Sequence, residues 1–225
     1  MDLKLKKLRS RIIENPRTRL YLISPPAFDL NTFEETLKSA LGGGDVACFQ
    51  LRMKDQSPAD IRRAAENLIP IAQANDVAFL LNDDPELAKS IGADGVHIGQ
   101  DDTPYKQARA IVGDDAIVGV TCHDSRHLAM TAVESGADYV AFGAFYPTET
   151  KVAKSTATPE ILHWWHTMIE APCVAIGGIT VDNAVPLIKS GADFLAISGG
   201  VWNYTHGPEK AVAEFNRVID MTVAT

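Results

Sequence analysis

One stretch of this sequence occurs three times in nearly the same form: GADGVHIG at residues 92–99, GADYVAFG at residues 136–143 and GADFLAIS at residues 191–198. Each copy starts with a glycine that can end a helix, continues through a turn residue and finishes in a short apolar run. The apolar runs do not alternate strictly with polar residues, which indicates strands buried on both faces. The repeat therefore predicts strands of a parallel sheet.

Five further apolar runs bring the number of predicted strands to eight; they lie at residues 20–23, 47–51, 78–81, 117–120 and 174–176. Helix-length segments separate the runs. Several of these segments open with a capping residue beside favourable first-turn chemistry, namely Ser57-Pro58, Asp84-Pro85, Thr103-Pro104, Thr158-Pro159 and Thr180. Strand and helix thus alternate along the whole chain.

Right-handed crossovers repeated eight times can close a sheet on itself, and the chain length suits such a barrel. We therefore predict a single α/β domain over residues 1–225, a (β/α)8 TIM barrel in which residues 1–19 form an N-terminal helical extension. An open doubly wound sheet is the alternative. The Gly42-Gly43-Gly44 run is interpreted as a turn between helix and strand, because no longer Pro/Gly/Ser-rich linker divides the chain.

Composition excludes several classes of protein. With 46% hydrophobic and 22% charged residues, the 225-residue chain has the composition of a globular protein. Its net charge of −8 opposes nucleic acid and anionic membranes as partners, whereas small anionic substrates remain compatible with local clusters of cations. Cys48, Cys122 and Cys173 are widely separated and predict neither disulfides nor a zinc site, which favours the cytoplasm. A homo-oligomer is left open.

The N-terminal segment differs in charge from the rest of the chain. Residues 1–19 hold seven Lys/Arg and two Asp/Glu, but no apolar stretch of the length found in signal peptides. Leu3, Leu5, Leu8 and Ile12 predict an amphipathic helix that buries one side against the domain. A partner-binding arm is the alternative, and no chemistry is assigned to the segment.

Charged side chains follow the predicted strands at their carboxyl ends, where the chemistry of such barrels is located. Gln50, Arg52 and Lys54 alternate after the second run, and two cations with an amide suit a multiply charged phosphate group. Asp83 and Asp102 follow the third and fourth runs and are the predicted ligands of Mg²⁺. The neighbouring aspartates, Asp84 and Asp101, are instead expected to cap helices.

Small and hydroxyl-bearing residues follow the last three strands. Thr148, Thr150 and Lys151 lie in a loop that can close over an anionic ligand. The runs Gly177-Gly178 and Ser198-Gly199-Gly200 leave room for backbone N–H groups to approach a phosphate. Their position on the seventh and eighth strands predicts a binding site for a phosphate monoester.

The histidines receive no catalytic role at this stage. His97 lies within a predicted strand and is interpreted as a core imidazole, whereas His123 follows a strand and is a candidate to face the pocket. His127, His163, His166 and His206 fall in helices or late loops, and we assign them no function.

Five ordered motifs together resemble thiamine phosphate synthases over residues 20–215. They are Gln50-Leu51-Arg52-x-Lys54, Asn82-Asp83-Asp84, Gly95-Val96-His97-Ile98-Gly99-Gln100-x-Asp102, Tyr146-Pro147-Thr148-x-Thr150-Lys151 and Gly177-Gly178-Ile179. The resemblance implies an enzyme that joins the diphosphate of an aminopyrimidine to thiazole phosphate with Mg²⁺. The products are thiamine monophosphate and pyrophosphate, and the reaction passes through a pyrimidine carbocation.

The resemblance also implies a role for each matching residue. Contacts to the pyrimidine diphosphate fall to Gln50, Arg52, Lys54, Asn82, Thr121 and Lys151, of which Arg52, Lys54, Thr121 and Lys151 are the predicted catalytic residues. Asp83 and Asp102 match the metal ligands. The thiazole phosphate site corresponds to Thr148, Thr150, Gly178, Ile197 and Ser198.

Two other functions remain as alternatives. A thiazole tautomerase on a related barrel shares the thiazole phosphate site but needs no contacts to a diphosphate. The residues that argue against it are Arg52, Lys54, Asp102 and Lys151. A non-catalytic, phosphate-binding regulator would bind thiazole phosphate without metal-dependent turnover.

Overall fold

The computed structural model describes residues 17–148 and 155–223 and contains a closed barrel of eight parallel strands. The strands are β1 (Arg19–Ile23), β2 (Val46–Leu51), β3 (Ala78–Asn82), β4 (Gly95–Ile98), β5 (Ile117–His123), β6 (Tyr139–Gly143), β7 (Cys173–Ile176) and β8 (Phe194–Ile197). Each strand pairs with the next along the chain, and β8 pairs with β1. This closure confirms the predicted barrel and excludes the open sheet.

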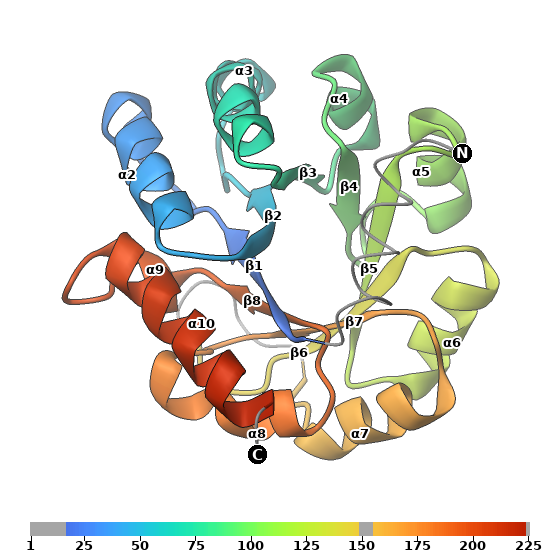
Figure 1. Ribbon diagram of the computed structural model, residues 1–225. Helices are drawn as coiled ribbons and strands as arrows, with labels where there is room; N and C mark the ends of the chain where they lie inside the picture. The colour runs from blue at the N-terminus through green and yellow to red at the C-terminus, as the bar shows by residue number, and fades with distance from the viewer. Residues whose placement is uncertain (1–16, 149–154, 224–225) are drawn as a thin grey trace.

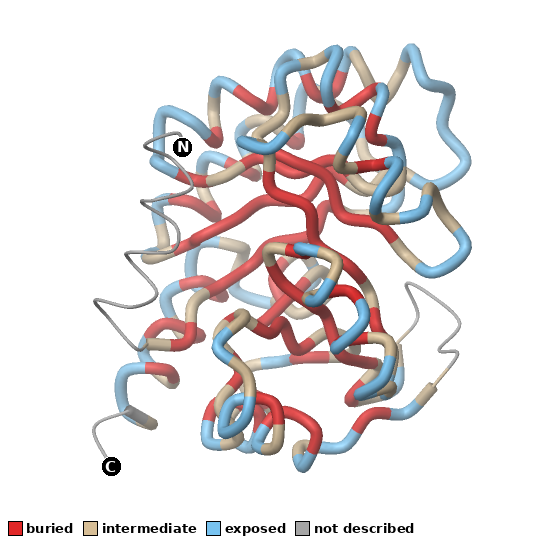
Figure 2. The backbone as a smooth tube through the Cα atoms, turned by 90° about the vertical axis from the view of Figure 1, so that its right-hand side faces the viewer, coloured by how far each residue is buried: buried red, intermediate tan, exposed pale blue. Residues whose placement is uncertain are grey.

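Helices surround the barrel on the outside (Figure 1). They are α2 (Leu30–Gly42), α3 (Pro58–Ala74), α4 (Pro85–Ser90), α5 (Tyr105–Val112), α6 (Arg126–Glu134), α7 (Pro159–Met168), α8 (Val185–Lys189), α9 (Gly199–Trp202) and α10 (Pro208–Val223), with a 3₁₀ turn at Val181–Asn183. Figure 2 shows the strands as mostly buried and the outer faces of the helices as exposed. Within the described residues, no helix is long and apolar enough to cross a membrane.

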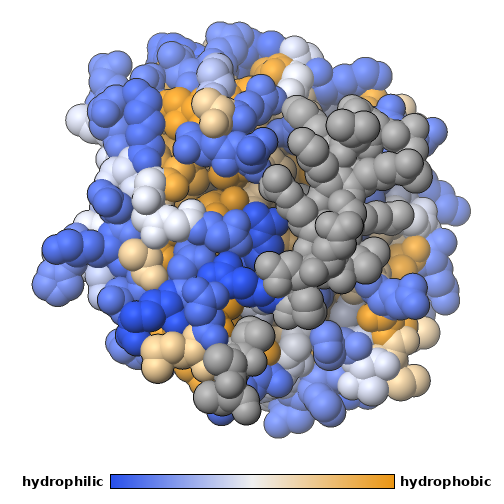
Figure 3. All heavy atoms as spheres, viewed as in Figure 1, coloured by the Kyte–Doolittle hydropathy of each residue, from blue (hydrophilic) through white to orange (hydrophobic). Residues whose placement is uncertain are grey.

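Two apolar cores result from this arrangement. The larger lies between the strands and the helices and includes Phe49, Phe79, Phe142, Trp165 and Phe215. The smaller fills the barrel interior. On the coloured part of the surface in Figure 3, hydrophilic residues predominate and hydrophobic residues form patches between them. The coloured part of this face therefore agrees with the burial of most apolar side chains in the two cores.

The aspartate of each GAD repeat binds the strand that precedes it. Oδ2 of Asp94 accepts from the backbone N–H of Phe79 at 2.8 Å, Oδ2 of Asp138 from Val118 at 2.9 Å, and Oδ2 of Asp193 from Cys173 at 2.8 Å. The glycines that open the repeats have φ values of +69°, +104° and +88°, which favour glycine because a Cβ atom would be strained there. The repeat thus ends a helix and fixes two neighbouring strands together.

Most of the predicted helix starts are confirmed. The side chain of Ser57 accepts from the N–H of Asp60, and that of Asp84 accepts from Leu87, with proline in the first turn of both helices. The prediction that Asp101 caps a helix is wrong. Helix α5 begins at Tyr105 after Pro104 and has no side-chain cap, because the intervening residues form the loop that carries Asp102.

The last residues of the predicted N-terminal extension are not helical. Arg17 and Thr18 lead directly into β1, whose first residue is Arg19. The guanidinium groups of both arginines bind the carboxylate of Asp45, and Arg17 also binds Asp220 and Asn216 on α10. These contacts hold the backbone extended, so the helix prediction is wrong for residues 17–19. Residues 1–16 lie outside the described residues.

Replacing Asp193 with alanine should destabilise the barrel. The variant leaves the buried N–H of Cys173 without its acceptor, and a loss of this kind costs about 1–3 kcal/mol of the free energy of unfolding. Urea denaturation measures the difference. Asp115→Ala, at an exposed position in the α5–β5 loop, is the matched control. Equal stability of the two variants would contradict the role of the repeat.

Candidate active site

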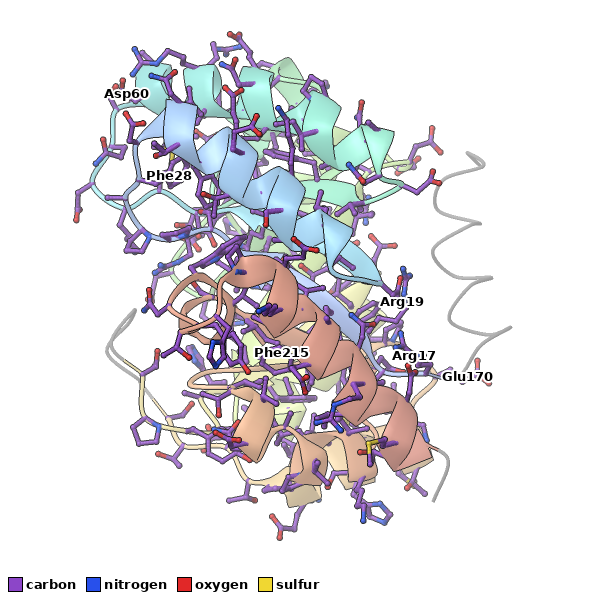
Figure 4. The ribbon with its side chains drawn as sticks, turned by 60° about the vertical axis from the view of Figure 1, so that its left-hand side comes forward. Arg17, Arg19, Phe28, Asp60, Glu170 and Phe215 are labelled. Atoms are coloured by element: carbon purple, nitrogen blue, oxygen red, sulfur yellow. The ribbon has the colours of Figure 1, made fainter. Side chains whose placement is uncertain are left out.

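Polar side chains gather at the carboxyl end of the barrel, as the parallel strands require. Figure 4 shows Phe28 and Asp60, which follow β1 and β2, at one end of the molecule, and Arg17 and Arg19 at the other. The predicted site residues follow the strands at the end marked by Phe28 and Asp60.

Gln50 and Asn82 meet across neighbouring strands. The amide Nε2 of Gln50 donates to Oδ1 of Asn82 at 2.7 Å, and Gln50 is 2% exposed. The bond joins the end of β2 to the end of β3. This hydrogen bond fixes the orientation of both amide groups. Their other polar atoms, Oε1 of Gln50 and Nδ2 of Asn82, are then held in place, which suits recognition of a polar ring.

Arg52 and Lys54 bring positive charge to the same place. Strand β2 ends at Leu51, so strand alternation does not extend to Lys54, whose backbone N–H instead donates to the carbonyl of Pro26 at 3.1 Å. Burial lowers the pKa of the Arg52 guanidinium, and the charge of Asp83 opposes that shift. The charges of Arg52 and Lys54 both lower the pKa of Asp83, so both cations act on this carboxylate.

Asp83 and Asp102 form a carboxylate pair. Asp83 has a φ of +69°, and its N–H donates to the carbonyl of His97 at 2.8 Å. Asp102 is held by the N–H of Gly99, which donates to Oδ2 at 2.7 Å. Burial, the hydrogen bond with Asp102 and the charge of Asp102 together raise the pKa of Asp83 to about 6, although the cations of Lys54 and Arg52 oppose the shift.

This pair fits a divalent cation with a preference for oxygen ligands. Within residues 17–148 and 155–223, no group of three or more His, Cys, Asp or Glu side chains is placed to hold a metal. Asp83 and Asp102 together offer two carboxylates, and the other positions around an ion would go to water and ligand phosphates. That is the coordination Mg²⁺ favours. Burial and the charge of Asp102 raise the pKa of Asp83, so a cation between the two carboxylates would favour their charged forms.

Thr121 stands on the inner wall beside this group. Its hydroxyl lies 2.8 Å from Nε2 of His97, and its carbonyl accepts from Nε2 of Gln100 at 2.5 Å. His97 is 7% exposed, which confirms its interpretation as a core imidazole. His123 follows an irregularity in the β5–β6 pairing and has a φ of +55°.

Glycines let the last loops of the barrel approach one another. A Cβ atom on Gly178, whose φ is +63°, would overlap the carbonyl of Pro147, and one on Gly200 would overlap the carbonyl of Ile179. A Cβ on Gly199 would meet only Nδ2 of Asn203, at 3.5 Å. Gly178 and Gly200, which were predicted to admit a phosphate, therefore also allow neighbouring backbone segments to approach closely. Gly199 has the most free space around its Cα atom of these three glycines.

The remaining predicted residues lie as follows. Ile197 is 1% exposed and packs in the outer core, so a contact with a ligand can come only from its backbone. Thr148 is half-buried at the end of the described part of its loop. Thr150 and Lys151 lie outside the described residues.

Ser24 is a site residue that the sequence did not reveal. Its hydroxyl accepts from the N–H of Arg52 at 2.9 Å and donates to the carbonyl of Arg52 at 3.2 Å. The carbonyl of Ser24 accepts from Oγ of Ser198 at 3.3 Å. Ser24 therefore links the cationic side of the site to the glycine loops. A single serine after a strand carries no signal for this, because both partners are distant in sequence.

Residues 20–201 match the model of a family described as thiamine monophosphate synthase. The thiamine-phosphate synthase of Rhodospirillum centenum is 66% identical over 201 residues, covering 89% of this chain and 97% of that protein. The thiamine-phosphate synthase of Hyphomonas neptunium is 52% identical over 210 residues, covering 91% and 95%. A solved thiamine phosphate pyrophosphorylase from Pyrococcus furiosus has a TM-score of 0.80 at 28% identity, covering 96% of this chain and 99% of that one.

The carboxylate pair should make the metal-free protein less stable as the pH rises. Asp83 has a folded-state pKa of about 6 against an ordinary value of 3.8, so the folded state binds more protons between these values. Stability is then lost as the pH rises through that window. Asp102→Asn removes one charge and keeps an acceptor for Gly99, so near pH 7.5 it should be more stable than the unmodified chain by up to about 1 kcal/mol.

Urea denaturation in EDTA, near pH 5 and near pH 7.5, measures this effect. The gain from Asp102→Asn should be larger at the higher pH, and Asp115→Asn, at an exposed position, should show no such difference. A lower stability of Asp102→Asn near pH 7.5 would show that the two carboxylates do not repel each other.

Proposed function

Because this chain belongs to the thiamine monophosphate synthase family, we propose a residue-level account of its reaction. The chain is an enzyme, a thiamine-phosphate synthase. In the proposed reaction, the pyrimidinylmethyl group of 4-amino-2-methyl-5-hydroxymethylpyrimidine diphosphate is transferred, and its methylene carbon bonds to the ring nitrogen of thiazole phosphate. The products are thiamine monophosphate and pyrophosphate. The observation that carries the account is the grouping of two cations, two carboxylates and a paired amide at one end of the barrel.

The pyrimidine diphosphate would bind at the ends of β2, β3 and β5. Arg52 offers a planar fork and Lys54 a compact charge for the diphosphate oxygens, and Lys151 is proposed to close over them. Gln50, Asn82 and Thr121 supply polar groups for the pyrimidine. The bond between Gln50 and Asn82 supports this assignment, because it fixes two of these groups before the substrate arrives.

Asp83 and Asp102 would hold Mg²⁺. When bound, the ion neutralises charge on the diphosphate oxygens and so makes diphosphate a better leaving group. The protein's own part is to hold the two carboxylates together against their repulsion. Gly99 does so for Asp102, and the left-handed backbone conformation at Asp83 directs that residue away from the strand course.

Thiazole phosphate would bind on the opposite side, at the loops after β6, β7 and β8. The hydroxyls of Thr148, Thr150 and Ser198 and the backbone at Gly178 and Ile197 are the proposed contacts. The open position of Gly199 supports a phosphate at this place. Ser24 then joins the two halves of the site through Arg52 and Ser198.

Bond breaking precedes bond formation in the proposed mechanism. The carbon–oxygen bond to diphosphate breaks and both electrons leave on oxygen, where Arg52, Lys54 and Lys151 stabilise them. The aminopyrimidine ring supports the cation that remains. The thiazole nitrogen then donates its lone pair to the methylene carbon, and no proton is transferred in this step.

No protein nucleophile is needed, and the cysteines are unsuited to that role. Cys48, Cys122 and Cys173 are all buried. Burial raises the pKa of Cys122 to about 12 and raises the pKa of the other two thiols well above the usual value. All three thiols therefore remain protonated near neutral pH, and positioning with electrostatic stabilisation accounts for the reaction.

We also infer the setting in which the enzyme works. Three free cysteines favour the cytoplasm, where thiols stay reduced. Its proposed partners are the two small-molecule substrates. Self-association remains a prediction, which light scattering coupled to size-exclusion chromatography would test.

Purified protein mixed with both substrates and Mg²⁺ tests the function. Mass spectrometry should detect thiamine monophosphate, and a coupled assay should detect pyrophosphate in equal amount. Isomerisation of thiazole phosphate alone would indicate a tautomerase. Binding of thiazole phosphate without turnover would indicate a regulator.

Arg52→Gln should lower kcat by about 10²- to 10³-fold, because it removes a charged donor aimed at the departing diphosphate. Arg63→Gln on α3 is the matched control, since the side chain of Arg63 is 70% exposed and bound to Asp60. Pyrophosphate release measured at saturating substrate compares the two. An unchanged kcat for Arg52→Gln would overturn the proposed role of this residue.

A further inference from the structure

A chain of hydrogen-bonded side chains runs through the barrel interior and ends at Thr121. The hydroxyls of Tyr21 and Tyr139 are 2.9 Å apart. The hydroxyl of Tyr139 lies 2.8 Å from Nδ1 of His97, and Nε2 of His97 lies 2.8 Å from Oγ1 of Thr121. Tyr21, Tyr139 and His97 are 3%, 5% and 7% exposed. Three strands thus contribute buried polar groups that lead to one hydroxyl of the site.

The packing of the barrel makes room for this chain. Gly119 pairs with His97 on one side and with Tyr139 on the other. A Cβ atom on Gly119 would overlap the phenol ring of Tyr139. Because Gly119 has no side chain, the ring of Tyr139 can occupy this space and its hydroxyl can reach His97.

The surroundings of Tyr21, at the inner end of this hydrogen-bonded chain, determine which group donates in each hydrogen bond. Around the Tyr21 hydroxyl, the described residues supply Tyr139, the thiol of Cys48 and an otherwise apolar lining that includes Ala78, Leu80 and Phe194. If Tyr139 donated to Tyr21, the Tyr21 proton would have only a thiol sulfur, a weak acceptor, in a buried place. If Tyr21 donates to Tyr139 instead, Tyr21, Tyr139 and His97 each donate to a strong acceptor, and only the Thr121 hydroxyl, at the end next to the site, has a proton without an acceptor in the chain. Buried donors without acceptors are rare, which favours the second arrangement.

From this direction the rest follows. The Tyr139 O–H donates to Nδ1 of His97, so the neutral imidazole carries its proton on Nε2. That N–H donates to Oγ1 of Thr121. The Thr121 hydroxyl then accepts this hydrogen bond from His97 in the barrel interior, and its own proton is free to point toward the ligand.

We propose that Tyr139 and His97 are positioning residues that fix the Thr121 hydroxyl as a hydrogen-bond donor to an acceptor atom of the pyrimidine diphosphate. The proposal rests on the function proposed above. It makes the Thr121 hydroxyl a donor toward the substrate, whereas a hydroxyl without these partners can either donate or accept. It also accounts for three polar side chains in the inner core where apolar ones would satisfy packing alone.

Nitrogen-15 NMR of the full-length protein labelled at histidine tests the tautomer directly. Spectra of His97→Asn identify the His97 signals among those of the six histidines. The expected result near pH 7.5 is a neutral ring with the proton on Nε2 and an unprotonated Nδ1. A proton on Nδ1, or a doubly protonated ring, would overturn the proposal, and neither result depends on enzyme activity.

A double-mutant cycle tests the link to the reaction. Tyr139→Phe should lower kcat/KM by about tenfold, the effect of losing roughly one hydrogen bond. In a Thr121→Val background the same change should alter kcat/KM by less than about twofold, because both residues act through one hydroxyl. Multiplicative effects of the two changes would contradict the proposal.

Two further variants separate positioning from stability. Tyr105→Phe removes a hydroxyl on α5 that accepts from Arg109, and it should leave kcat/KM unchanged. Tyr21→Phe keeps the Tyr139 donor and should preserve the Nε2 tautomer, whereas loss of that tautomer would contradict the assigned direction. If the unmodified protein shows the expected tautomer but makes no thiamine phosphate, the proposed function is wrong, whereas the assigned direction of hydrogen-bond donation from Tyr21 to Thr121 is still supported.

Discussion

The hydrogen bond from a backbone N–H to each repeated aspartate holds one pair of neighbouring strands in register, namely β3 with β4, β5 with β6 and β7 with β8, and the site depends on the register of the barrel. Asp94, Asp138 and Asp193 each accept from the N–H of the preceding strand at or near its start. A slip of one residue would turn every side chain of a strand to the other face. Gln50 would no longer face Asn82, and His97 would not reach Thr121. The groups at the amino end of the barrel therefore set the geometry at the carboxyl end.

At that carboxyl end the protein holds charges that oppose one another. Asp83 and Asp102 repel each other, and burial discourages the charged forms of both Asp83 and Arg52. Such an arrangement lowers the stability of the free protein but suits a ligand that brings its own charges. A diphosphate with a divalent cation would pair with both sets of side chains at once. In the proposed complex, the stability lost in the free protein would be recovered as binding.

The two cores of the barrel have different tasks. The outer core is built of aliphatic and aromatic side chains, and it holds the helices against the strands. The inner core also contains the hydroxyls of Tyr21 and Tyr139, which burial would penalise if they lacked partners. Their bonds run toward His97 and the site, so part of the interior supports chemistry as well as packing. Ser24 has a comparable role at the rim, where it joins Arg52 to Ser198.

The sequence by itself determined the alternation of strand and helix, the caps at Ser57 and Asp84 and the strands after which Asp83 and Asp102 follow, because these depend on local propensity and period. It was wrong for Asp101 and for residues 17–19, where a loop and the ion pairs with Asp45 override local preference. Only the tertiary structure decided that Ser24 meets Arg52, or that Tyr139 reaches His97 across Gly119. Such contacts depend on which residues stand opposite each other in neighbouring strands, and register arises only when the barrel closes.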